Sequence, residues 1–251
     1  MSAIKTEAFI LKTQDYRDTS LLATFYTRDY GKLRAIVKGV RDTRGRFGST
    51  LEPFSLNEIL FYRRKRGGDL HHATQVDLVR EFGDIRSDLE RLSYACYFTD
   101  LLNELTEIED ANERIFELMN DALDFMGNGA SPRRTARIFE VKLLELLGFM
   151  PEIKNCVICQ VGTPERAFFN IPMGGVVCAK CRTGNAGFPV SRGTLSFVEH
   201  AQRTPLPNMT QVKVSQEVGA ELEKTLRRFV DYHLHNKLKS VVFLEKMGFA
   251  S

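Results

Sequence analysis

The sequence lacks the features that mark several large classes of protein. No stretch of its 251 residues approaches the run of about 18 or more apolar residues that a membrane-spanning helix requires, so we predict no membrane span. Charged residues begin at Lys5 and Glu7, before any apolar run, so we also predict no secretory signal peptide. Neither an internal repeat nor a low-complexity segment is present. These absences favour a cytoplasmic globular protein.

Sequence motifs of common catalytic sites are also missing. The chain has no Gly-x4-Gly-Lys-Ser/Thr phosphate loop, no His-Glu-x2-His motif and no Gly-x-Ser-x-Gly motif. His71 and His72 would point to opposite faces of a strand, so they cannot hold one metal ion together. His233 and His235 do not share a helix face either. We therefore do not expect an enzyme, and a metal-dependent nuclease built from scattered acids remains an alternative.

The chain contains five cysteines, and four of them have the spacing of a structural zinc site. Two Cys-x2-Cys pairs, Cys156 with Cys159 and Cys178 with Cys181, are separated by 18 residues. Each pair would form a tight knuckle, and two knuckles supply the four thiolates of a tetrahedral Zn²⁺ site. Two disulfides are the alternative, although they are more typical of short secreted chains. A closed four-thiolate site leaves no position for water, so we expect one structural Zn²⁺.

Charge is divided unevenly along the chain. Residues 1–80 contain 15 Lys and Arg but nine Asp and Glu, whereas residues 81–128 contain 13 acids and three basic residues. The whole chain carries only +3. A basic head followed by an acidic middle indicates that the head binds a polyanion and the middle does not. The acidic middle is most simply a solvated surface, and attraction of a basic partner is the alternative.

Residues 1–80 are predicted to form a small β-barrel. Five short segments of strand-like composition lie between turn residues, a pattern typical of a five-stranded OB-fold. An open SH3-like barrel would give a similar pattern. The predicted strands are 7–13, 20–27, 32–40, 54–62 and 70–79.

The apolar period becomes helical after Phe82. Ser87 with Glu90 is predicted as a capping box, and Ser131 followed by Pro132 is predicted to start a later helix. The predicted fold class is therefore α+β, an OB barrel followed by a mainly helical domain with an embedded four-cysteine zinc ribbon. The predicted parts are 1–80 (barrel), 81–150 (helical domain, first part), 151–190 (zinc module) and 191–251 (helical domain, C-terminal part).

Cationic side chains gather on one predicted strand of the head and in the loop after it. Side chains alternate across a sheet, so Leu33, Ala35 and Val37 would face the core and the residues between them would face outward. Cations along a strand and a loop can follow a phosphate backbone, and an aromatic ring can stack on a base. A solvated edge strand and a solvated turn are the alternatives. The predicted nucleic-acid residues are Lys32, Arg34, Lys38, Arg41, Arg44, Arg46, Phe47, Arg63 and Lys65.

The helix predicted after Ser131 carries a second candidate site. Arg134, Arg137, Ile138 and Val141 lie near one another at helical spacing. An acidic peptide that ends in an apolar residue would find a charge partner and a groove wall there. The alternative is that Ile138 and Val141 belong to the core and that the arginines are solvated.

Several segments, in order along the whole chain, resemble the RecO family of bacterial DNA repair proteins. Each is weak alone, whereas their order and spacing together are specific. They are Ala8–Lys12 (AFILK), Asp18–Leu22 (DTSLL), Gly31–Gly39 (GKLRAIVKG), Leu51–Phe54 (LEPF), Arg137–Phe149 (RIFEVKLLELLGF), the four cysteines and Leu238–Leu244 (LKSVVFL).

The resemblance implies an OB-fold, a helical C-terminal region and a zinc module. It further implies a nucleoid-associated recombination mediator of the RecF-type pathway that binds single- and double-stranded DNA and anneals complementary strands. Together with RecR, such a protein helps RecA displace single-stranded DNA-binding protein, whose acidic, apolar C-terminal tail docks on the helical part. A zinc-ribbon nucleic-acid adaptor in transcription or translation is the alternative.

Overall fold

The computed structural model of the chain describes residues 3–17, 19–38, 40, 51–63, 69–162, 164, 166–184, 186–212 and 214–250. The chain divides into two compact units, Met1–Leu123 with Leu238–Ser240, and Asp124–Lys237 with Val241–Ser251. The division into four parts that was expected from the sequence stays a prediction. None of the described helices is long and apolar enough to cross a membrane.

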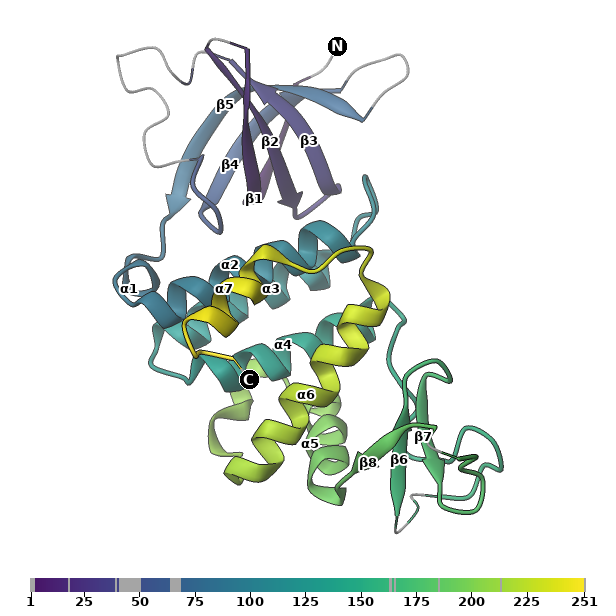
Figure 1. Cartoon of the computed structure of the whole chain (residues 1–251). Coiled ribbons are helices and arrows are strands. Elements are labelled where there is room, and N and C mark those ends of the chain that lie inside the picture. The colour runs from purple at the N-terminus through teal and green to yellow at the C-terminus, as the bar shows by residue number, and fades with distance from the viewer. Residues whose placement is uncertain are drawn as a thin grey trace. The chain divides into compact units, whose positions relative to one another are not determined.

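The first unit starts with a closed five-stranded barrel in the order β1-β2-β3-β5-β4 (Figure 1). Neighbouring strands are antiparallel except β3 and β5, whose short parallel pairing closes the barrel. This is the architecture of an OB-fold, so the predicted α+β class is confirmed and the SH3-like alternative is wrong. The strands are β1 (Ala3–Tyr16), β2 (Ser20–Thr27), β3 (Gly31–Val37), β4 (Leu56–Tyr62) and β5 (Leu70–Arg80).

Alternation along the strands fills the barrel with apolar side chains. Leu33, Ala35 and Val37 of β3 are buried there, as the sequence predicted, and they share this core with Ile10 and Phe25. Because side chains on a strand alternate between its two faces, the positions between these residues point out of the barrel.

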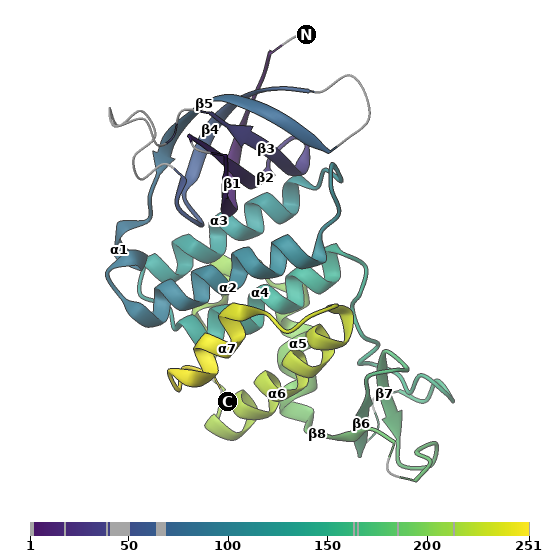
Figure 2. The same ribbon diagram turned by 45° about the horizontal axis from the view of Figure 1, so that its top comes forward.

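Three helices follow the barrel: α1 (Gly83–Arg86), α2 (Leu89–Leu105) and α3 (Glu113–Gly127). The carboxylate of Asp88 accepts the N–H of Arg91 at 2.9 Å and caps α2. The cap therefore lies one residue later than the predicted capping box at Ser87. Phe9 of β1 points out of the barrel, and its ring lies 4.9 Å from that of Phe116 on α3. The first turns of α3 thus pack directly on the barrel (Figure 2).

The segment between α2 and α3 pairs with the start of β3. Ile108 forms a parallel bridge with Lys32, and the N–H of Glu109 donates to the carbonyl of Lys32 at 2.9 Å. Gly31 has a φ of +64°, and a Cβ at this position would collide with the carbonyl of Asp110. Only glycine combines this backbone angle with so close an approach. The contact holds the end of α2 against the outer face of the barrel.

Serine residues begin the helices of the second unit. The hydroxyl groups of Ser131, Ser191 and Ser215 each accept an N–H three residues later, so the helices predicted to start there are confirmed. The last helix of the chain, α7, was not predicted. The helices after α3 are α4 (Pro132–Leu146), α5 (Arg192–Arg203), the 3-10 helix η2 (Leu206–Gln211), α6 (Gln216–His233) and α7 (Lys239–Lys246).

Candidate functional site

A ribbon of three short strands follows α4 and precedes α5 in the chain (Figure 1). Cys178 ends one of these strands, and the other three cysteines of the predicted site lie in the segments beside them. The sequence predicted a zinc ribbon here, and the structure gives that ribbon three strands, the third of which follows the second knuckle. The N–H of Val157 in the first knuckle donates to the carbonyl of Val176 at 2.9 Å, and this pairing brings the two knuckles together. The strands, in the order β7-β6-β8, are β6 (Ala167–Asn170), β7 (Gly175–Cys178) and β8 (Phe188–Val190).

The four sulfur atoms have the spacing of a tetrahedral metal site. All four lie within 4.8 Å of one another, and the Sγ atoms of Cys159 and Cys178 are 3.8 Å apart. A metal–sulfur distance of about 2.3 Å places the corners of a tetrahedron about 3.8 Å apart, whereas a disulfide bond measures only about 2.05 Å. All five cysteines of the chain are free thiols. The site could therefore hold one metal ion, and the disulfide alternative is not supported.

Backbone donors prepare two of the sulfurs for a cation. Burial opposes ionisation of Cys156, but N–H groups of both knuckles donate to its Sγ and lower its pKa to about 6. The N–H of Cys181 likewise lowers the pKa of Cys178. Hydrogen bonds to neighbouring sulfurs raise the pKa of Cys181 to about 12, because the last thiol of a crowded group keeps its proton. A bound divalent cation would favour the thiolate form of all four.

The rest of the described chain offers no second metal site of this kind. Among the residues that the structure describes, no other group of three or more His, Cys, Asp or Glu side chains brings its ligand atoms together. The described residues therefore provide no acidic metal-binding cluster of the kind that the nuclease alternative requires.

A row of polar side chains crosses the outer face of the barrel. Lys12 of β1 pairs with Thr24 of β2, and Thr24 pairs with Arg34 of β3. Arg34 is exposed, as predicted. The register of β1 shifts between Ile10 and Lys12, and this β-bulge turns Lys12 outward. Lys12 was not among the predicted residues, because uninterrupted alternation from the inward-facing Ile10 would place it inside the barrel.

Lys32 does not offer its charge to solvent, so its prediction as an exposed nucleic-acid contact is wrong. The residue is 8% exposed. Its Nζ donates to the carbonyl oxygens of Asn103, at 2.6 Å, and Thr106 at the C-terminal end of α2. A cation at this end of a helix offsets the partial negative charge of the unpaired carbonyls. Burial lowers the pKa of Lys32, and Glu107 and Glu104 partly oppose that effect.

The other predicted nucleic-acid residues have different surroundings. Lys38 is exposed at the end of β3, whereas Ile36, expected on the outer face, is buried. Arg63 is about half exposed, lies 3.6 Å from the carboxylate of Glu109 and stacks over the ring of Tyr30 at 5.2 Å. Its charge is therefore shared with an acid of the same unit. The remaining ones, Arg41, Arg44, Arg46, Phe47 and Lys65, lie outside the described residues.

The predicted peptide site on α4 needs correction. Ile138 and Val141 are fully buried, so they belong to the core and cannot form a groove wall. Arg137 is 5% exposed, and its guanidinium lies 2.8 Å from the carboxylate of Glu140. Of the four predicted residues, Arg134 and Arg137 do line a pocket, which opens on a different side of the helix.

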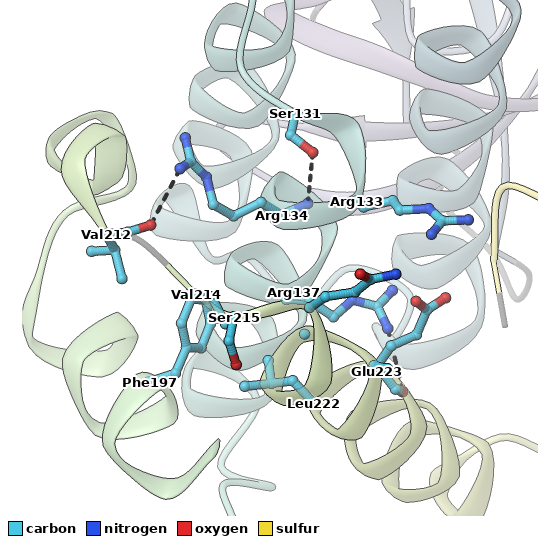
Figure 3. Close-up of a pocket in the computed structure, with 13 residues that line it drawn as sticks. Ser131, Arg133, Arg134, Arg137, Phe197, Val212, Val214, Ser215, Leu222 and Glu223 are labelled. Carbon is cyan, nitrogen blue, oxygen red and sulfur yellow. Dashed lines mark hydrogen bonds between the residues drawn. The ribbon is translucent and has the colours of Figure 1, made fainter. Parts of the chain in front are cut away.

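This pocket has a volume of about 620 Å³ and lies between α4, α6 and the segment around α5 and η2 (Figure 3). Arg134 donates to the carbonyl of Val212 at 3.3 Å, and Arg137 donates to that of Glu223 at 3.4 Å. The buried Nε of each arginine finds no acceptor among the described residues. Apolar walls complete the pocket, formed by Phe197, Val212, Val214, Ala220 and Leu222.

Comparisons with known proteins cover almost the whole chain. Residues 1–82 match the family model "Recombination protein O N terminal", and residues 86–241 match "Recombination protein O C terminal". A protein named DNA repair protein RecO from Syntrophus aciditrophicus is 34% identical over 248 residues, 97% of this chain and 95% of the relative. Proteins of the same name from Desulforamulus reducens and Pelotomaculum thermopropionicum are each 31% identical over 249 residues. These matches cover 98% and 99% of this chain, respectively, and 96% of each relative.

Proposed function

The chain belongs to the RecO family of DNA repair proteins, and from this premise we propose that it is a recombination mediator of the RecF-type pathway. In this role it binds single- and double-stranded DNA and anneals complementary strands. With RecR it promotes the loading of RecA on DNA that is coated by single-stranded DNA-binding protein. Annealing breaks and forms no covalent bond, so the proposed role requires no catalytic residue.

The observation that carries this proposal is the cationic outer face of the OB barrel. Lys12, Arg34 and Lys38 are exposed on β1 and β3 or at the end of β3, and none has an ion-pair partner among the described residues. Unpaired cations on a strand face lower the repulsion between two phosphate backbones. Contacts to phosphates leave base edges free, so complementary strands held there can still pair.

We also propose that the metal is Zn²⁺ and that its role is structural. Four thiolates at tetrahedral spacing are the donor set and geometry that Zn²⁺ takes in closed sites. Such an ion would tie the knuckle at Cys156 and Cys159 to the end of β7 and fasten the ribbon as one piece. Because the ribbon and the barrel belong to separate units, we expect DNA binding by the barrel to persist when the metal is removed.

Charge reversal on the barrel tests the DNA-binding role. We expect Arg34→Glu with Lys38→Glu to weaken binding to all sequences alike, because phosphate contacts carry no sequence information. Each lost contact removes about 0.7 from the salt slope for a single strand, so the slope should fall by about 1.4. The measurement is salt-dependent binding to single-stranded, duplex and gapped DNA.

The matched control is Lys224→Glu with Lys246→Glu, which changes the net charge equally at exposed positions of α6 and α7. We expect its affinity and slope to remain close to those of the unmodified protein. If the two double variants bind DNA equally well, the barrel face serves solubility and the DNA site lies elsewhere.

The pocket beside α4 supports a partner for the proposed role. We propose that it binds the acidic, apolar C-terminal tail of single-stranded DNA-binding protein. Arg134 would supply the charge partner, with an Nε that finds no acceptor among the described residues, whereas the charge of Arg137 is already paired with Glu140. Phe197, Val214 and Leu222 would cover the apolar end of the peptide. These three residues take the place of Ile138 and Val141 in the original prediction.

Peptide titration tests this partner. We expect Arg134→Glu to weaken binding of the tail peptide about 10- to 100-fold, the range that corresponds to loss of one charge-assisted hydrogen bond of about 1.5–3 kcal/mol. Arg192→Glu, an equal charge change at an exposed position on α5, should bind like the unmodified protein. Equal weakening in both variants would show only a long-range charge effect, and no binding to the unmodified protein would remove the partner.

A further inference from the structure

A second pocket lies in the first unit, where the end of α2 meets the outer face of the barrel. Its volume is about 250 Å³. The barrel contributes cationic and polar side chains from three adjacent strands, and the helical segment contributes one wall. The lining residues are Lys12, Gln14, Thr24, Lys32, Arg34, Asn103 and Ile108.

The strand register places the charged groups of this pocket in one line. Lys12, Thr24 and Arg34 are successive cross-strand partners on β1, β2 and β3. Directly opposed side chains on a sheet are about 5 Å apart at Cβ, so the Cβ atoms of Lys12 and Arg34 are about 10 Å apart, with Thr24 between them. Gln14 lies two residues beyond Lys12 on the same strand face, and its amide can donate into the same space.

The charge of the pocket is not neutralised by its own walls. Lys32 lines the pocket, but its ammonium group already donates to the carbonyls of Asn103 and Thr106. Lys12 and Arg34 have no acid within ion-pair distance among the described residues. Two free cations with neutral donors between them therefore favour an anion.

We propose that this pocket binds one phosphodiester group of a single-stranded nucleic acid, held by Lys12 and Arg34 and by donors from Gln14 and Thr24. The proposal rests on the proposed DNA-binding function and adds to it a defined site, three barrel residues that were not predicted (Lys12, Gln14 and Thr24), and a wall from the helical segment. The volume is below the roughly 300–1,000 Å³ of pockets that enclose drug-sized ligands, which suits one phosphate with its sugar.

The wall formed by Asn103 and Ile108 favours a single strand over a duplex. A duplex is stiff over about 150 base pairs, so its phosphates follow a fixed helical path and cannot turn individually into a recess. A single strand can bend one phosphate inward and rest its sugar against the apolar side chain of Ile108. The pocket should therefore contribute more to single-strand binding than to duplex binding.

The test compares two lysines of the same strand. Lys12→Gln removes one of the two free cations of the pocket, whereas Lys5→Gln removes an exposed cation of β1 that pairs with Glu58 at 2.7 Å. For an oligonucleotide of thymidine, we expect Lys12→Gln to weaken binding several-fold and to lower the salt slope by about 0.7. Lys5→Gln should leave both quantities unchanged. Lys12 is exposed, so thermal unfolding of the full chain should be unaffected by its substitution.

The outcomes separate the pocket from the proposed function. If the unmodified protein binds DNA and the two variants behave alike, the pocket assignment is wrong while DNA binding by the barrel stands. If the unmodified protein binds no DNA, the proposed function fails, and the pocket proposal with it. Inorganic phosphate and thymidine monophosphate are added as competitors. Displacement of the oligonucleotide by either competitor, at a concentration similar to that of the oligonucleotide, would identify a small-anion site and overturn the assignment to a polymer backbone. Failure of both competitors to displace the oligonucleotide would support that assignment.

Discussion

Replacing Cys178 with serine is expected to abolish metal binding and to unfold the ribbon between α4 and α5. Cys178 ends β7, its Sγ lies 3.8 Å from that of Cys159, and its N–H donates to the Sγ of Cys156. It therefore links the strand to both halves of the site. Zinc binding by isolated zinc-finger peptides has an apparent free energy of about 10–16 kcal/mol, so loss of one ligand should remove a large part of the ribbon's stability.

Metal content per chain and amide hydrogen exchange of the ribbon are the measurements. Cys96→Ser is the control, because Cys96 lies on α2 and outside the metal site. The control should keep one Zn²⁺ per chain and a protected ribbon, and barrel amides should remain protected in both variants. Retention of one tightly bound Zn²⁺ by Cys178→Ser, or a folded protein with no metal and two disulfides, would contradict the assignment.

The second large effect is expected from Arg137→Ala, which breaks a buried ion pair inside α4. Both side chains of the pair with Glu140 are nearly inaccessible, at 6% and 0% exposed. Removing one partner of a buried pair costs about 3–5 kcal/mol, because the remaining charge stays in a poorly solvating environment. We expect the free energy of unfolding to fall by that amount, measured by urea denaturation.

Two comparisons isolate the cause of this effect. Arg133→Ala removes an exposed arginine of the same helix and should cost less than about 1 kcal/mol. Arg137→Leu with Glu140→Leu replaces both charges by apolar groups and should be more stable than Arg137→Ala, because no carboxylate that has lost Arg137 then stays buried. If Arg137→Ala is as stable as Arg133→Ala, the ion pair between Arg137 and Glu140 contributes little to the free energy of unfolding. The same pair explains why Arg134, and not Arg137, is the informative position for peptide binding.

Local patterns in the sequence were sufficient to predict most of the helices and strands, though not α7 or β8, and the four cysteines that could hold a metal ion. The spacing of the four cysteines implies two knuckles, because two residues between paired cysteines form a tight turn that points both sulfurs at one ion. The serine at position 131, followed by proline, marks a helix start through hydrogen bonds within four residues. Alternation on β3 assigned the core side of the barrel correctly. Each of these signals is carried by neighbours in the chain.

What covers each surface was decided only by the tertiary structure. Alternation predicts that Lys32 points out of the barrel. Its ammonium group is nevertheless buried against the carbonyls of Asn103 and Thr106, which lie 71 and 74 positions later in the chain. A one-residue shift in strand pairing, which depends on the partner strand, turned Lys12 outward. Helical spacing grouped Arg134 and Arg137 with Ile138 and Val141, yet packing buried the last two and placed the pocket toward α6. Periodicity determines which way a side chain points, whereas long-range packing determines what it meets there.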